Sequence, residues 1–187
     1  MSLKRIAPVA ALLMSVTATG ALLASGAGSE RGKLLPQTLN AKYQSECAAC
    51  HIAYPPALLP ARSWEKLMAG LANHFGENAS LDVESAREIA EYLVRESGDR
   101  GMSRKGRKVA NSIPVSDSPL RITDTQWFRH EHDDISAAVW RRVAVGSPAN
   151  CGACHRGAAE GDYSERRVAI PRDTGDAAAG QASLRPR

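Results

Sequence analysis

A five-residue pattern of two cysteines and one histidine occurs twice in this chain of 187 residues. Residues 47–51 read C-A-A-C-H and residues 151–155 read C-G-A-C-H, and together they use all four cysteines. In C-x-x-C-H, the thiols can form thioether bonds with the vinyl groups of a porphyrin, and the histidine can bind its iron. The repeat therefore predicts two covalently bound haem c groups. The predicted attachment residues are Cys47, Cys50, Cys151 and Cys154, and the predicted proximal ligands are His51 and His155.

Other uses of paired cysteines fit the pattern less well. A disulfide across so short a loop would constrain the chain little. Zinc sites made of two C-x-x-C pairs place the pairs roughly 15–20 residues apart, whereas about a hundred residues separate them here. A thioredoxin-like redox motif would need a βαβ pattern around it, which the sequence does not show. We therefore keep haem attachment as the interpretation of both motifs.

The first residues have the features of an export signal. Lys4 and Arg5 precede an apolar run over residues 6–23, and small residues follow at 24–28, as in a secretory signal peptide. We expect a signal peptide over residues 1–28 and a periplasmic protein, with an uncleaved membrane anchor as the alternative. No later hydrophobic run is long enough to cross a bilayer.

Composition limits the core and the partners. Aromatic residues make up only 5% of the chain, so its own core would be thin, and two porphyrins would add large apolar surfaces for packing. The formal net charge is +4, and loss of Lys4 and Arg5 with a signal peptide would halve it. Such a charge gives no general reason to expect nucleic-acid binding.

Hydrophobic spacing predicts an all-α fold with long loops and little or no sheet. Residues 30–45 should form a short helix leading into the first motif, and three prolines within 52–60 should hold that segment as an extended loop. A helix should follow with Ser63 as its N-cap. Another should run from about 81 to 96, with Ser80 as its cap and Val83 on its buried side.

Residues 97–118 read as a basic linker, in which five Lys and Arg residues alternate with Gly and Ser. This segment is either a solvated loop or a docking patch for an acidic redox partner. It would separate two haem-binding lobes, at about 34–96 and 119–171, within one domain over 30–171. The composition of residues 172–187 predicts a disordered tail.

Three histidines lie outside the two motifs and could fill the second axial position of an iron. His74 borders an apolar helical stripe that includes Trp64, Met68 and Leu71. We prefer His74 as the distal ligand of the first haem, because the neighbours of Met68 make that residue look like ordinary packing.

For the second haem, the sequence leaves a choice between His132 and His130. Residues 123–126 have the form of a capping box, so a helix should begin there. On that helix His132 would share the apolar side with Phe128 and Val143, whereas His130 would lie on a mostly polar side. We therefore prefer His132, with His130 as the alternative. His74 follows a motif histidine by 23 residues, and His132 precedes the other by 23.

The sequence around these positions resembles the small dihaem cytochrome c family of bacterial periplasms. The resemblance rests on A-Y-P-P at 53–56, L-L-P-A-R-S-W at 58–64, H-F-G-E-N-A at 74–79 and N-C-G-A-C-H at 150–155, and it extends over roughly 35–171. It implies a mostly helical fold with two low-spin haems, each held by two histidines. The implied pairs are His51 with His74, and His155 with His132.

The resemblance also implies a periplasmic electron carrier that is not an enzyme. Its partners would be redox proteins, such as a small oxygen-binding monohaem cytochrome or a membrane cytochrome b, and we expect no nucleic acid and no small-molecule substrate. The alternative is a small dihaem peroxidase-like enzyme or a haem-based sensor with one open iron site. These possibilities differ in whether both His74 and His132 reach iron.

Overall fold

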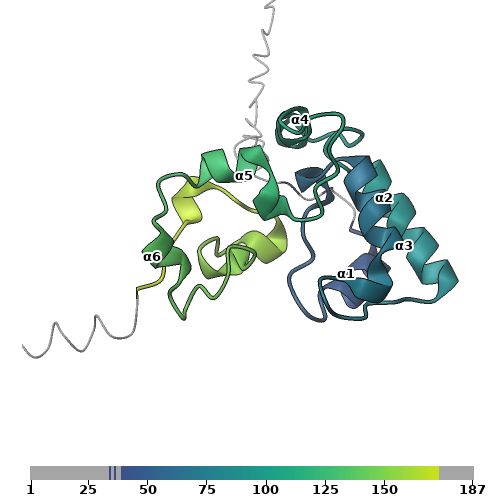
Figure 1. Cartoon of the computed structure of the whole chain (residues 1–187), viewed down its shortest axis with the longest axis horizontal. Helices are drawn as coiled ribbons and strands as arrows, with labels where there is room; N and C mark the ends of the chain where they lie inside the picture. Colours follow the sequence, from purple (N-terminus) through teal and green to yellow (C-terminus); the bar gives the residue numbers. More distant parts are fainter. Residues whose placement is uncertain (1–33, 35, 37–38, 173–187) are drawn as a thin grey trace, which may run out of the picture.

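The computed structural model describes residues 34, 36 and 39–172 (Figure 1). Within these residues the chain forms six α-helices joined by 3-10 turns and loops, and only isolated β-bridges. The predicted all-α fold class is therefore confirmed. The predicted signal peptide over 1–28 and all but the first residue of the predicted tail over 172–187 lie outside the described residues.

Three helices gather on one side of the molecule (Figure 1). They are α1 (Ala41–Cys47), α2 (Ala61–Ala69) and α3 (Val83–Arg95). Helix α1 begins later than predicted, because the side chain of Asn40 caps it by accepting a hydrogen bond of 2.7 Å from the N–H of Tyr43. The three helices enclose a core made of Tyr43, Ala53, Leu59, Trp64, Ile89, Tyr92 and Leu93.

The predicted starts of α2 and α3 are wrong by three and two residues, respectively. Helix α2 begins at Ala61 directly after Pro60, so Ser63 is not a cap but lies buried inside the helix. In α3 the cap is Asp82, whose carboxylate accepts a hydrogen bond from the N–H of Ser85, instead of Ser80. Residues 52–60, which lie between α1 and α2, form the predicted loop, with one 3-10 turn at Pro56–Leu58.

The buried side of α3 also differs from the prediction. Val83 is 87% exposed, whereas Ile89 and Tyr92 are buried. Val83 is the first residue of the helix, and its side chain lies on the solvent-facing side. The side of the helix that carries Ile89 and Tyr92 faces the core instead.

The segment predicted as a basic linker contains a helix, α4 (Arg104–Asn111). Val109 and Ala110 are buried on one side of it, and the helix packs against the 3-10 turn Pro56–Leu58. A Cβ atom at Gly106 would lie 2.9 Å from the Cβ atom of Ala57, so the absence of a side chain lets the two backbones approach. Gly106 and Ser103, which caps the helix, thus serve packing here and are not signs of a loop.

On the other side of the molecule lie α5 (Gln126–Glu131), α6 (Ala137–Trp140) and the second motif (Figure 1). The capping residue of α5 is Thr125, whose hydroxyl accepts a hydrogen bond from the N–H of Phe128, and not Thr123. The predicted long helix ends at Glu131, so Val143 does not share a stripe with His132 and is 97% exposed.

The two ends of the described chain meet. The N–H of Leu34 donates a hydrogen bond of 3.0 Å to the carbonyl oxygen of Gly161. Leu34 is buried with Ala57, Leu58 and Val109, and Ile122, Trp127 and Tyr163 pack against this second core cluster. The two predicted lobes therefore share a buried cluster that includes α4.

Among the described residues, no helix is both long and apolar enough to span a bilayer.

Candidate functional site

The first motif follows directly from α1, which ends at Cys47. The Nδ1 atom of His51 lies 2.6 Å from the carbonyl oxygen of Ile52, and its ring stacks on Tyr54 with the ring centres 4.8 Å apart. A metal-binding histidine commonly donates its second ring N–H to a backbone carbonyl, which fixes the ring and leaves the other nitrogen for the metal. His51 has this arrangement.

His74 lies close to His51, on a tight turn and not beside the helical stripe predicted for it. Helix α2 ends at Ala69, and His74 and Glu77 exchange two backbone hydrogen bonds of 2.7 and 3.2 Å. Phe75 (φ 56°) and Gly76 (φ 105°) lie between His74 and Glu77. Both have positive φ, as the central residues of mirror-image hairpin turns do. The ring of His74 lies 6.2 Å from that of His51, centre to centre, with 27° between the planes.

Burial lowers the pKa of His74, and the neighbouring His51 and the Arg121 guanidinium lower it further. The guanidinium carbon of Arg121 lies 3.9 Å from the centre of the Phe75 ring. The neutral imidazole, which is the form that binds a metal, is therefore favoured at this position.

The second motif forms a 3-10 turn, Cys151–Ala153, that leads to His155. The ring of His155 lies 6.1 Å from that of His132, at 78° between the planes. The Nδ1 atom of His132 lies 2.8 Å from the carbonyl oxygen of Phe128, and the two rings stack at 4.2 Å. Burial is the first cause that lowers the pKa of His155, followed by the charges of His132 and Lys105.

The competing candidates lie elsewhere. The side chain of His130 is 77% exposed and faces Asp133, with 3.9 Å between Nδ1 and Oδ2. Met68 packs against the first core cluster, as the sequence indicated. Met102, the other methionine among the described residues, is 89% exposed. The structure thus brings His132 opposite a motif histidine and leaves His130 at the surface.

No disulfide joins any two of the four cysteines, all of which lie in the described part of the chain. Burial raises the pKa of Cys47 and of Cys151 to about 11, and it also raises the pKa of Cys154. A thiol that exchanges disulfides needs a lowered pKa, so these motifs do not have the electrostatics of a redox dithiol. The described residues include no group of three or more His, Cys, Asp and Glu side chains placed to hold a metal ion.

The two histidine pairs have the spacing that an axial pair requires. A metal–imidazole bond is about 2.0 Å and the ring centre lies roughly 1 Å beyond the nitrogen, so two imidazoles on opposite sides of one ion have centres roughly 6 Å apart. The observed separations are 6.2 and 6.1 Å. His51 and His132 each have Nδ1 next to a backbone carbonyl oxygen. The residues present therefore fit a haem iron between each pair.

Three side chains near the histidines were not found from the sequence. Tyr54 stacks on His51, Tyr163 lies 5.2 Å from His155 and Arg121 covers Phe75. Only Tyr54 had a sequence signal, since it stands three residues after a motif histidine. Tyr163 and Arg121 are brought to the sites by tertiary contacts.

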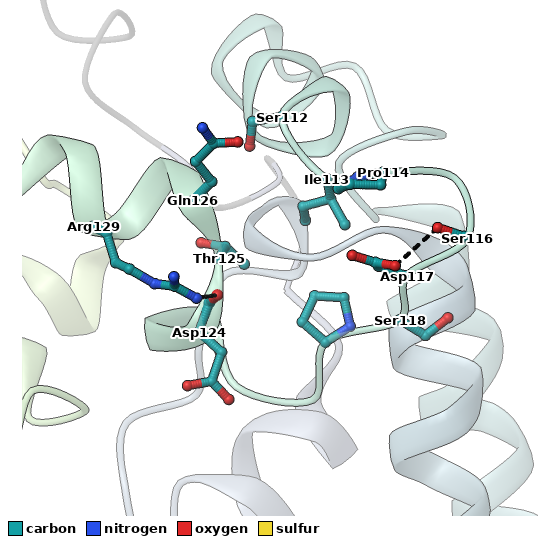
Figure 2. A pocket seen from close by; sticks show the side chains of 11 residues that line it. Ser112, Ile113, Pro114, Ser116, Asp117, Ser118, Asp124, Thr125, Gln126 and Arg129 are labelled. Carbon is teal, nitrogen blue, oxygen red and sulfur yellow. Dashed lines mark hydrogen bonds between the residues drawn. The ribbon is translucent and has the colours of Figure 1, made fainter.

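A hollow of about 670 Å³ lies apart from the motif histidines, between the segment that follows α4 and the start of α5 (Figure 2). Its lining is mostly short polar side chains. The guanidinium of Arg129 donates a hydrogen bond to the backbone carbonyl of Asp124, and the hydroxyl of Ser116 donates one to the carboxylate of Asp117 (Figure 2). The lining contains no histidine and no cysteine. We assign no chemistry to it.

The paired attachment motifs and the helical fold define a c-type cytochrome with two haems. The family model of dihaem cytochromes c matches residues 43–163, and the chain belongs to this family. It carries two covalently bound haem c groups, so the prediction of cofactors is confirmed, and it is an electron carrier of the cytochrome c class.

Solved structures agree with this assignment. The diheme cytochrome c of Rhodobacter sphaeroides is 44% identical, with a TM-score of 0.61, and the match covers 67% of this chain and 98% of that one. A diheme cytochrome c of Shewanella baltica is 38% identical, with a TM-score of 0.58, over 74% of this chain and 97% of that one. Among curated proteins, none matches the chain.

Proposed function

We propose that the protein is a periplasmic electron carrier in which each haem iron is held by two histidines, His51 with His74 and His155 with His132. The observation that carries this proposal is the pairing of ring centres at 6.2 and 6.1 Å. Haem supplies reversible one-electron chemistry when bound. Two imidazoles at one iron leave no open position for peroxide or oxygen, which argues against a peroxidase or a gas sensor.

The chain's own residues set the conditions for this chemistry. The Nδ1 contacts of His51 and His132 with backbone carbonyls hold the rings in place and leave the other ring nitrogen of each for the iron. Histidine in both axial positions favours the ferric state more than methionine does, so we expect low potentials. The partly buried Tyr54 and Tyr163 shield one face of each motif histidine from water.

Optical and EPR spectra of the ferric protein at neutral pH test the ligation. We expect low-spin signals from both haems and no rapid binding of cyanide. A high-spin signal from one haem would show an open iron site and would favour the peroxidase-like or sensor alternative. The location is tested separately, by measuring the mass of the protein recovered from the periplasm, from which the first residues, to about residue 28, should be missing.

The basic surface of α4 supports a redox protein as the partner. We define this surface as Arg100, Arg104, Lys105, Arg107 and Lys108. Of these five side chains, only Lys108 has a carboxylate of the described residues within 4.0 Å, that of Glu131 at 3.8 Å. Lys105 lies over the ring of Trp127 and is close enough to His155 to lower its pKa. An acidic surface on the partner would be steered toward the second haem site.

Charge reversal tests this docking surface. Arg104→Glu with Arg107→Glu should slow electron exchange with an acidic redox protein and remove much of its salt dependence. The matched control is Arg87→Glu with Arg95→Glu on α3, which changes the net charge equally on another surface. Equal slowing by both pairs would mean that net charge alone steers the encounter. A small oxygen-binding monohaem cytochrome and a membrane cytochrome b are the partner types to assay first.

A further inference from the structure

Tyr54 contacts both haem sites. Its ring stacks on that of His51, with centres 4.8 Å apart and 28° between the planes. Its phenolic hydroxyl donates a hydrogen bond of 2.8 Å to the carbonyl oxygen of Ala149, which lies two residues before Cys151. A single side chain thus joins the proximal histidine of the first motif to the backbone that carries the second.

Tyr163 contacts the second proximal histidine. Its ring centre lies 5.2 Å from that of His155, and its hydroxyl is buried without a hydrogen-bond partner in the described structure. Burial raises the pKa of both Tyr54 and Tyr163. Each motif histidine therefore has one partly buried tyrosine ring against it, Tyr54 against His51 and Tyr163 against His155.

The position of Tyr54 is fixed from more than one side. The hydroxyl of Tyr43, a buried residue of α1, donates a hydrogen bond of 2.6 Å to the carbonyl oxygen of Tyr54. Three buried prolines, Pro55, Pro56 and Pro60, follow it in a loop with little freedom. An aromatic ring held by backbone, hydroxyl and stacking contacts occupies one orientation, which is what a defined separation between two redox centres requires.

We propose that Tyr54 is the positioning residue that sets the electronic contact between the two haem sites, and that Tyr163 supports this contact at the second motif histidine. The proposal rests on the function proposed above. In the transfer between the sites, one ferrous iron loses an electron and becomes ferric, and the other ferric iron gains it and becomes ferrous. No covalent bond forms or breaks and no proton moves. Tyr54 would join the two sites through its ring and hydroxyl contacts, and Tyr163 packs against the second proximal histidine.

The experiment measures electron equilibration between the haems after one electron is injected by a photoexcited ruthenium complex. Tyr54→Leu removes the ring, and we expect the exchange to slow by roughly tenfold, because small displacements of redox groups have large effects on rate. Tyr54→Phe keeps the ring and should retain most of the rate. The separation of the two midpoint potentials should change in Tyr54→Leu and be partly restored in Tyr54→Phe.

The matched control is Tyr92→Leu, which removes a buried ring from the same core that contacts Tyr43 and neither motif histidine. Variants are compared only when both haems are attached and low-spin. If Tyr54→Leu exchanges electrons within about twofold of the parent, the proposal is overturned and Tyr54 is a packing residue. If Tyr92→Leu slows exchange equally, a loosened core is responsible, and the proposal is again wrong. A parent with a high-spin haem would instead contradict the proposed ligation.

Discussion

The hydroxyl of Tyr54 and the carbonyl oxygen of Ala149 are joined by a 2.8 Å hydrogen bond across 95 positions of sequence. Tyr54→Phe removes only this bond, and the Ala149 carbonyl keeps the hydrogen bond that it accepts from the N–H of Cys151. We expect the free energy of unfolding to fall by about 1 kcal/mol, as measured by urea denaturation of the holoprotein. Tyr163→Phe is the control, because the hydroxyl of Tyr163 is buried without a partner and its loss should be neutral or slightly stabilising. Equal losses in both variants would contradict the assignment.

The turn that presents His74 depends on Gly76. Its φ of 105° is one that residues with a Cβ rarely adopt, although no atom would obstruct that Cβ. Gly76→Ala should therefore destabilise the turn by about 1–2 kcal/mol through backbone strain alone. We expect His74 to detach from the first haem more readily, seen as faster cyanide binding at that haem.

A matched glycine without this strain is available. Gly70 caps the C-terminal end of α2 with φ of −106°, and a Cβ there would meet its neighbours at 3.5 and 3.6 Å, which is ordinary contact. Gly70→Ala should leave the cyanide kinetics unchanged. Faster binding in the Gly70 variant as well would show that general loosening near α2, and not the turn, controls the ligand.

The covalent chemistry of the motifs could be predicted from the sequence, because C-x-x-C-H encodes its role in adjacent residues. The partner histidines could be predicted only as candidates. His132 was chosen on the assumption of a continuous helix, but the chain leaves the helix at Glu131 and His132 is held by the Phe128 carbonyl and ring. Its position follows from the end of a helix, which periodicity does not reveal.

Helix starts and tertiary contacts were the parts that sequence reasoning missed. Ser80 and Asp82 are both good capping residues, and the choice between them depends on where α3 meets its neighbours. The 104–111 segment looked like a linker because Gly and basic residues dominate it, yet its glycine permits close packing on Ala57. Tyr163 reaches His155 only through the fold. Such contacts have no local signature.

Gly98 provides a test of whether α4 is a packed element. A Cβ at Gly98 would lie 2.7 Å from the carbonyl oxygens of both Ala57 and Gly106. These are backbone atoms that cannot rotate away, so Gly98→Ala should destabilise the protein by about 1–3 kcal/mol and increase protease cleavage within residues 104–111. An unchanged urea midpoint would mean that α4 moves freely and that the linker interpretation was right.

Acid should weaken the segment that carries Tyr163. The Ser164 N–H and the Arg167 guanidinium hold the pKa of Asp162 low, at about 2. A carboxyl with a lowered pKa stabilises the fold above its unfolded pKa and loses that contribution as the pH falls toward its folded pKa. Asp162→Asn should therefore flatten the dependence of the urea midpoint on pH between about 4 and 2. Asp134→Asn, at an exposed carboxyl with no hydrogen-bond or ion-pair partner in the described structure, should leave that dependence unchanged.

His132 and His130 are two residues apart, and their replacement by alanine should affect the haem spectra in opposite ways. The ring of His132 lies 6.1 Å from that of His155, whereas His130 is exposed and faces Asp133. His132→Ala should convert one of the two haems to a high-spin or ligand-binding form, and added imidazole should restore its low-spin spectrum by filling the vacated space. His130→Ala should leave both haems low-spin. The reverse pattern would move the second distal ligand to His130 and would require the segment after α5 to refold around the cofactor.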